Sequence, residues 1–143
     1  MTTAADLIQK HTGGVATLPS TATVMDAAVM MNERHIGSVL VVDGGTMTGI
    51  FTERDILRRV LVGRLDPEAT ALSDVMTTVV ACANSTTTLD EIRHVMRERR
   101  IRHMPVIDGD DILGMVSIGD LNEVEQEIQE QTIAYLERYV SVL

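Results

Sequence analysis

The chain has 143 residues, of which 45% are hydrophobic and only 2% aromatic, and it carries a net charge of −9. This length suits one compact module, while the acidic charge argues against binding to nucleic acid or to an anionic membrane surface, since both attract basic faces. No apolar run approaches the roughly 20 residues of a membrane helix, and the N-terminus lacks the pattern of a secretory signal, so we expect a cytoplasmic protein. The single cysteine, Cys82, has no partner for an internal disulfide and is expected to be buried.

The first half of the chain predicts a strand, a helix, a hairpin and a second helix. A short strand is expected over residues 15–18, and apolar residues spaced three and four apart predict a helix over 24–35. A hairpin is predicted over 38–51, with its turn at a Gly-Gly pair. Thr52 then has the position of a helix N-cap, and the helix that it starts should end at Gly63.

The same order returns 65 residues later. A strand is predicted over 79–82, a helix over 88–100, a hairpin over 103–116, and a helix that Ser117 caps. Between the copies, a proline followed by an acid predicts a short helix within 65–76. Each copy is therefore a β-α-β-β-α unit, and the chain is predicted to be an α+β fold of two repeats packed against each other.

We expect one module over residues 1–143, with its repeats at 12–64 and 77–122. The acidic stretch 123–143 has no counterpart after the first repeat. Its apolar residues follow helical spacing, which predicts a helical extension. Two roles stay open for this extension: it covers one end of the core, or its apolar side meets a second subunit.

Both repeats contain the pattern Gly-apolar-apolar-hydroxyl-x-x-Asp. Its fixed positions are Gly49, Thr52 and Asp55 in the first copy, and Gly114, Ser117 and Asp120 in the second. A helix N-terminus presents free N–H groups and a partial positive charge, which suit a phosphate. An ionised aspartate one turn on can accept both hydroxyls of a ribose, so the pattern fits a nucleotide. The alternative is that each hydroxyl and aspartate only cap their helix.

The doubled pattern, with Gly-Ser-Val-Leu-Val-Val-Asp before it in the first copy and Arg-His-Met-Pro-Val-Ile-Asp in the second, resembles the cystathionine-β-synthase (CBS) domain pair, or Bateman module. The resemblance covers residues from about 12 to about 122. It implies a regulatory sensor and not an enzyme, without a catalytic cofactor. The regulatory ligand would contain adenosine, as AMP, ADP, ATP, NAD and S-adenosylmethionine do, and it would bind between the repeats and change the shape or partner affinity of the module.

The same resemblance implies which residues contact the ligand. The aspartates would bind ribose, the apolar residues would pack on adenine, and Arg54, Arg102 and His103 would contact phosphate. The full set is Thr17, Ile36, Gly37, Ser38, Ile50, Thr52, Arg54, Asp55, Ile101, Arg102, His103, Met115, Ser117 and Asp120. Because Gly37 and Ser38 stand where the second copy has Arg102 and His103, we predict two sites of unequal affinity.

Pairs of this kind usually associate, so a homodimer is predicted, through the helices over 24–35 and 89–100 or through the tail. Two other functions stay open: an assembly module that binds no ligand, and an enzyme that hydrolyses nucleotides with Glu53, Asp55 or His103 as acid and base. The histidines and the cysteine do not have the spacing of a metal site, so none is predicted.

Overall fold

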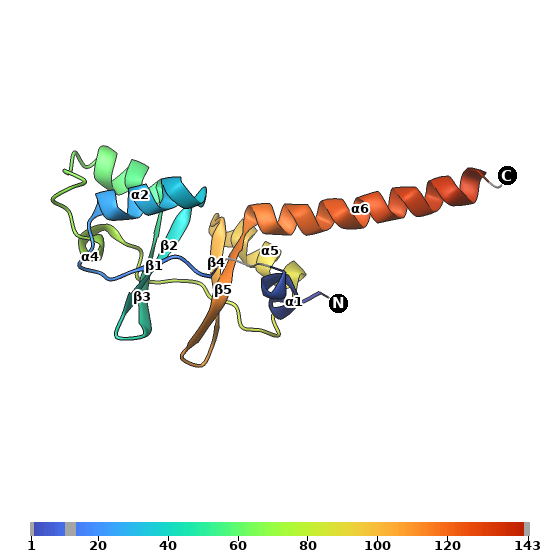
Figure 1. Cartoon of the computed structure of the whole chain (residues 1–143), viewed down its shortest axis with the longest axis horizontal. Helices are drawn as coiled ribbons and strands as arrows, with labels where there is room; N and C mark the ends of the chain where they lie inside the picture. The colour runs from blue at the N-terminus through green and yellow to red at the C-terminus, as the bar shows by residue number, and fades with distance from the viewer. Residues whose placement is uncertain (1, 11–13, 142–143) are drawn as a thin grey trace.

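The computed structural model describes residues 2–10 and 14–141. Its elements in chain order are α1 (Ala4–Gln9), β1 (Thr17–Leu18), α2 (Val24–Arg34), β2 (Ser38–Asp43), β3 (Thr46–Thr52), α3 (Glu53–Asp55), the π-helical η1 (Ile56–Leu61), α4 (Leu72–Val75), α5 (Leu89–Arg99), β4 (His103–Asp108), β5 (Asp111–Ser117) and α6 (Ile118–Ser141). Figure 1 shows the two hairpins in the middle of the molecule and α6 reaching beyond all other elements. The predicted α+β fold with two repeated units is confirmed.

The first unit is a three-stranded sheet with α2 packed on it. Strand β1 pairs in parallel with β2, and β2 pairs antiparallel with β3. The amide of Leu40 donates to the carbonyl of Ala16 at 2.9 Å, which ties the first strand to the hairpin. Phe51 is fully buried in a core that is otherwise aliphatic apart from methionine, and Val60 of η1 completes this core. The predicted order of strand, helix, hairpin and helix is therefore present.

The second unit lacks the strand that the sequence predicted over residues 79–82. Strands β4 and β5 form a two-stranded sheet, and beside it an isolated parallel bridge joins Ala83 to Val106. Pro105 occupies the position equivalent to Leu40 and has no N–H to donate. The hydrogen bond that anchors the first strand in unit one cannot form here. Cys82, which was expected to be buried, is therefore exposed.

Each unit is completed by the segment that precedes the other one. Helix α1 packs against the second unit: the amide of Ala4 donates to the carbonyl of Thr87 at 2.8 Å, and Leu7 is buried in the second core. Helix α4 packs against the first unit: the amide of Leu72 donates to the carbonyl of Ala22 at 2.8 Å. This exchange of helices interlocks the two repeats.

The sequence predicted a short helix within 65–76, and the structure has one there, but the linker begins with a turn. The amide of Glu68 donates to the Asp66 carboxylate at 3.0 Å, and the amide of Ala69 donates to the Asp66 carbonyl at 3.1 Å. Such local bonds from an aspartate compete with the start of a helix. Only from Leu72 does the linker form the single helical turn α4.

The acidic tail forms the helix α6, which covers the core only at its start. Leu121 is 1% exposed, and Val124 packs against the second core. Farther along, the large apolar side chains are at least 52% exposed: Ile128, Ile133, Tyr135, Leu136, Tyr139 and Val140. Figure 1 shows this part of α6 standing clear of the fold. Among residues 2–10 and 14–141, no helix has the length and apolar character needed to cross a membrane.

Candidate functional site

A cleft of about 1100 Å³ opens between the two units. The first unit contributes the end of α2 and the start of β2, and the second contributes parts of β4, β5 and the first turn of α6. About half of the predicted contact residues line it: Ile36, Gly37, Ser38, His103, Met115, Ser117 and Asp120. The cleft therefore brings the repeated motif of unit two together with the residues at the start of β2 in unit one.

The motif of the second unit faces this cleft. Ser117 lies directly before α6; its amide donates to Asp120 Oδ2 at 2.8 Å, and its Oγ accepts the Asp120 amide at 3.2 Å. This reciprocal cap fixes the carboxylate at the N-terminal end of a 24-residue helix. Helix α1 lies against Gly114: a Cβ at this position would come within 2.8 Å of Ile8 Cδ1. The result is a hydroxyl, a carboxylate and the N-terminal end of a helix beside an open space.

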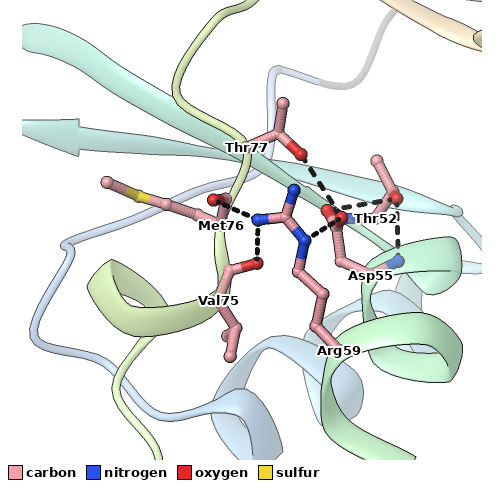
Figure 2. A network of polar contacts seen from close by, with 6 residues as sticks. All are labelled: Thr52, Asp55, Arg59, Val75, Met76 and Thr77. Carbon is pink, nitrogen blue, oxygen red and sulfur yellow. Dashed lines mark hydrogen bonds and ion pairs between the residues drawn. The ribbon is translucent and has the colours of Figure 1, made fainter. Parts of the chain in front are cut away.

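The motif of the first unit is closed by the protein itself, as Figure 2 shows. Asp55 is 7% exposed, and its Oδ2 accepts the Thr52 amide at 3.0 Å. Its Oδ1 accepts from Thr77 Oγ1 at 3.3 Å and lies 3.7 Å from Arg59 Nε. Both carboxylate oxygens therefore already have partners within the chain.

The linker forms the lid over this closed corner. The Arg59 guanidinium donates from Nη1 to the carbonyls of Val75 at 3.1 Å and Met76 at 2.8 Å. Ile50 and Thr77 exchange two backbone hydrogen bonds of 2.9 Å, and a Cβ on Gly49 would come within 2.7 Å of Met76 Sδ. The linker thus lies directly against the motif of the first unit.

A single sequence difference accounts for much of this asymmetry. Arg59 follows Asp55 by four residues, which places both on the same side of a helix. In the second repeat the equivalent position holds Val124, which packs against the second core. The Asp55 carboxylate is consequently paired within its own helix, whereas Asp120 is among the residues that line the cleft.

The two units meet closely at Gly37. A Cβ on Gly37 would lie 2.8 Å from Glu53 Oε1 of the same unit and 3.2 Å from His103 Cε1 of the second unit, so a larger residue would require these side chains to shift. Burial lowers the pKa of His103 from its ordinary value of 6.5, and the nearby carboxylates of Glu53 and Asp120 offset this only in part. At neutral pH His103 is therefore uncharged and offers hydrogen bonds and not a positive charge.

The remaining predicted contact residues do not line the cleft: Thr17, Ile50, Thr52, Arg54, Asp55, Ile101 and Arg102. Arg54 crosses to the second unit and donates to the carbonyl of Arg100. Arg102 and Thr17 are exposed, while Ile50 is buried under the linker. The structure thus places half of the predicted set at the cleft, three residues (Ile50, Thr52 and Asp55) at the closed corner, and the others elsewhere.

Sequence reasoning missed two cations of the cleft, Lys10 and Arg34, together with the neighbouring His35. A signal for Arg34 was present, because it stands two residues before Ile36 and is repeated as Arg99. No sequence pattern indicated that Lys10 lies at the cleft, because α1 reaches the cleft only through the exchange of helices. Among residues 2–10 and 14–141, no group of three or more His, Cys, Asp or Glu side chains is arranged to hold a metal ion.

Comparison with known proteins decides the family. The family model for the CBS domain matches this chain twice, over residues 4–62 and 72–127. The chain belongs to the CBS domain family. The resemblance inferred from the doubled motif is thereby confirmed, and a CBS domain pair is a regulatory module.

Several CBS proteins resemble the whole module. The CBS domain-containing protein YhcV of Bacillus subtilis is 32% identical over 115 residues, which cover 79% of this chain and 81% of YhcV. Hypoxic response protein 1 of Mycobacterium tuberculosis is 29% identical over 122 residues, 85% of this chain and 83% of that protein. The structure of a protein with CBS domains from Burkholderia ambifaria has a TM-score of 0.82 and 36% identity, and the match covers 91% of this chain and 96% of that one.

Proposed function

We propose that this CBS pair is a sensor that binds an adenosine-containing ligand in the cleft between its repeats and signals through a change of shape or of partner affinity. The observation that carries the proposal is the open corner formed by Ser117 and Asp120. There a carboxylate able to accept two ribose hydroxyls lies beside a helix N-terminus and a cleft of about 1100 Å³.

A more distant structure supports this class of ligand. The CBS domain pair of protein MJ0100 was crystallised in complex with 5′-methylthioadenosine and S-adenosyl-L-methionine. That structure has a TM-score of 0.78 with 22% identity, so it shares the fold with this chain. Both of its ligands contain adenosine, in line with the ribose recognition that we propose for Asp120.

We further propose that each chain binds one ligand. The Asp55 corner has its oxygens occupied by Thr52, Thr77 and Arg59, and the linker lies over it. A ligand there would have to displace the linker together with buried polar contacts, whereas Ser117 and Asp120 line the cleft. This refines the prediction of two unequal sites to one site per chain.

Isothermal titration of AMP, ATP, NAD and S-adenosylmethionine into the purified chain tests the proposal. We expect binding of at least one of them with one site per chain, and a loss of about tenfold or more in affinity for Asp120→Asn, because a charged acceptor is removed. The matched control is Asp55→Asn, which should lower the melting temperature and keep the ligand affinity.

Two other outcomes would replace the proposal. If none of the four ligands produces heat or thermal stabilisation, the chain is an assembly module that binds no ligand. If the purified chain turns over ATP or NAD and Glu53→Ala abolishes that turnover, it is an enzyme.

We also propose that the chain forms a homodimer through the exposed apolar side of α6. Large side chains such as Ile128 and Leu136 are more than half exposed there, and such surfaces commonly mark association sites. A hexameric CBS-CP12 protein from cyanobacteria, 27% identical, shows that a related fold assembles. Sedimentation equilibrium should show a dimer for the wild type and for Glu137→Gln, and a monomer for Leu136→Glu. A monomeric wild type at micromolar concentration would contradict this proposal.

A further inference from the structure

The described residues that line the cleft carry fixed charges whose sum is opposite in sign to the charge of the whole chain. The chain carries a net charge of −9. The described residues that line the cleft nevertheless include the fixed cations Lys10 and Arg34, and of these described residues Asp120 alone has a carboxylate. A cleft whose fixed charges sum to a positive value in an acidic protein attracts anions, since concave surfaces concentrate the field of the charges that line them.

Arg34 is available to a ligand. It lies in the last turn of α2 and is exposed, and among the described residues it has no hydrogen-bond or ion-pair partner. Lys10 is paired only with Glu127, at 4.0 Å, and both side chains are more than half exposed. Such exposed ion pairs contribute little to stability, so the cation can readily leave its carboxylate for another anion. Both cations can therefore turn to an anionic group in the cleft.

The cations that the family resemblance implied do not fill this role. Arg102 is exposed and does not line the cleft, and Arg54 donates to the carbonyl of Arg100. His103 does line the cleft, but it is uncharged at neutral pH because burial lowers its pKa. The positive charge of the cleft therefore comes from α1 and α2 and not from the start of β4.

A simpler explanation of Arg34 is that a cation in the last turn of a helix stabilises the negative end of the helix dipole. Arg99 has this position in α5 of the second repeat. The two arginines are equivalent in the repeat and both exposed, but only Arg34 is among the residues that line the cleft. Arg99 is therefore the matched control that separates a role in the helix from a role in the cleft.

We propose that Arg34, assisted by Lys10, recognises a phosphate group and makes the cleft selective for phosphate-bearing adenosine ligands over the cationic S-adenosylmethionine. The inference rests on the proposed function, because it specifies the ligand class of the same cleft. A guanidinium suits this role, since it matches phosphate oxygens with two parallel N–H donors.

The test is isothermal titration of adenosine, AMP, ATP and S-adenosylmethionine into wild type, Arg34→Gln and Arg99→Gln at two salt concentrations. For the wild type we expect AMP or ATP to bind more tightly than adenosine and S-adenosylmethionine, and their affinity to fall with salt. Arg34→Gln should weaken AMP and ATP by about tenfold and leave adenosine unchanged. Arg99→Gln should behave as the wild type, and melting curves without ligand should show that all three chains are folded.

Each other result overturns the inference in a distinguishable way. If S-adenosylmethionine binds the wild type at least as tightly as AMP and ATP, or if Arg34→Gln leaves AMP affinity unchanged, the selectivity role of Arg34 is wrong while the proposed function stands. An equal loss for adenosine and AMP would show that Arg34 only shapes the cleft, which also overturns it. If no adenosine ligand binds the wild type, the proposed function fails, and this inference fails with it.

Discussion

Arg59 Nε lies 3.7 Å from Asp55 Oδ1, one helical turn away along the chain. This pair turns the motif aspartate of the first repeat into a structural anchor, because the same guanidinium also holds the carbonyls of Val75 and Met76 in the linker. The two repeats thus use one motif in two ways. In the first, the aspartate binds the protein's own linker; in the second, it faces the cleft.

Arg59→Gln should destabilise the protein by about 1–2 kcal/mol. The substitution removes hydrogen bonds to the linker carbonyls and leaves the buried Asp55 carboxylate without its cation, and charge-assisted bonds contribute amounts of this order. Urea unfolding measures the change. The control is Arg58→Gln, an exposed neighbour that should remain within about 0.5 kcal/mol of wild type. Equal effects of the two variants would show that the Arg59 contacts contribute nothing.

Gly49→Ala should cost about 1–3 kcal/mol, and Gly114→Ala should cost less. A Cβ at Gly49 would lie 2.9 Å from the backbone oxygen of Thr77, which is held by paired hydrogen bonds and cannot give way. At Gly114 it would meet the side chain of Ile8, which belongs to the six-residue helix α1 and can shift. Thermal melting compares both with Gly14→Ala, where no atom lies within 4 Å of the added Cβ. A greater loss at Gly114 would contradict this ranking.

Stability should decrease as the pH falls below 6.5, in part through His103. Because its pKa is lower in the folded protein than the ordinary 6.5, the unfolded chain binds a proton that the folded one does not in the window between these two values. Stability therefore rises with pH there, with a slope of up to about 1.4 kcal/mol per pH unit, and is constant above the window. His103→Gln should flatten the slope, while His94→Gln, which removes an exposed histidine of α5, serves as the control. Identical slopes in all three proteins would refute the contribution of His103.

Cys82 should react with iodoacetamide in the folded protein, because it is exposed. Partial desolvation raises its pKa above 9.0, so less thiolate is present and the native rate should be lower than that of the protein unfolded in urea. Mass spectrometry at pH 8 follows both reactions. Modification of the thiol only after unfolding would contradict the finding that Cys82 is exposed in the folded protein.

The sequence carried enough information for the repeat order, the hairpins and the helix caps. Thr23, Thr52 and Thr88 each precede a helix and bond its third residue, as local capping rules require. The sequence-based prediction was wrong where the formation of an element depends on a contact with a residue far away in the sequence. The strand over 79–82 has suitable residues, but its formation depends on a donor that Pro105 lacks.

The candidate site, too, could be predicted from the sequence only where it depends on local motifs. The motif identified both aspartates, but the closure of the first corner depends on Thr77 and the linker, which meet Asp55 only in the folded chain. Lys10 reaches the cleft because α1 crosses to the second repeat. An arginine four residues after a motif aspartate is the one local sign that would have indicated the closed corner in advance.

The exchange of α1 and α4 between the repeats also determines the order of folding during synthesis. When the first repeat has left the ribosome, α1 has no surface to cover, because Leu7 packs among residues of the second repeat. Six residues cannot form a stable helix alone. Helix α1 is therefore fixed only after the second repeat has emerged, although it precedes the first repeat in the chain, and until then it stays accessible to chaperones and proteases.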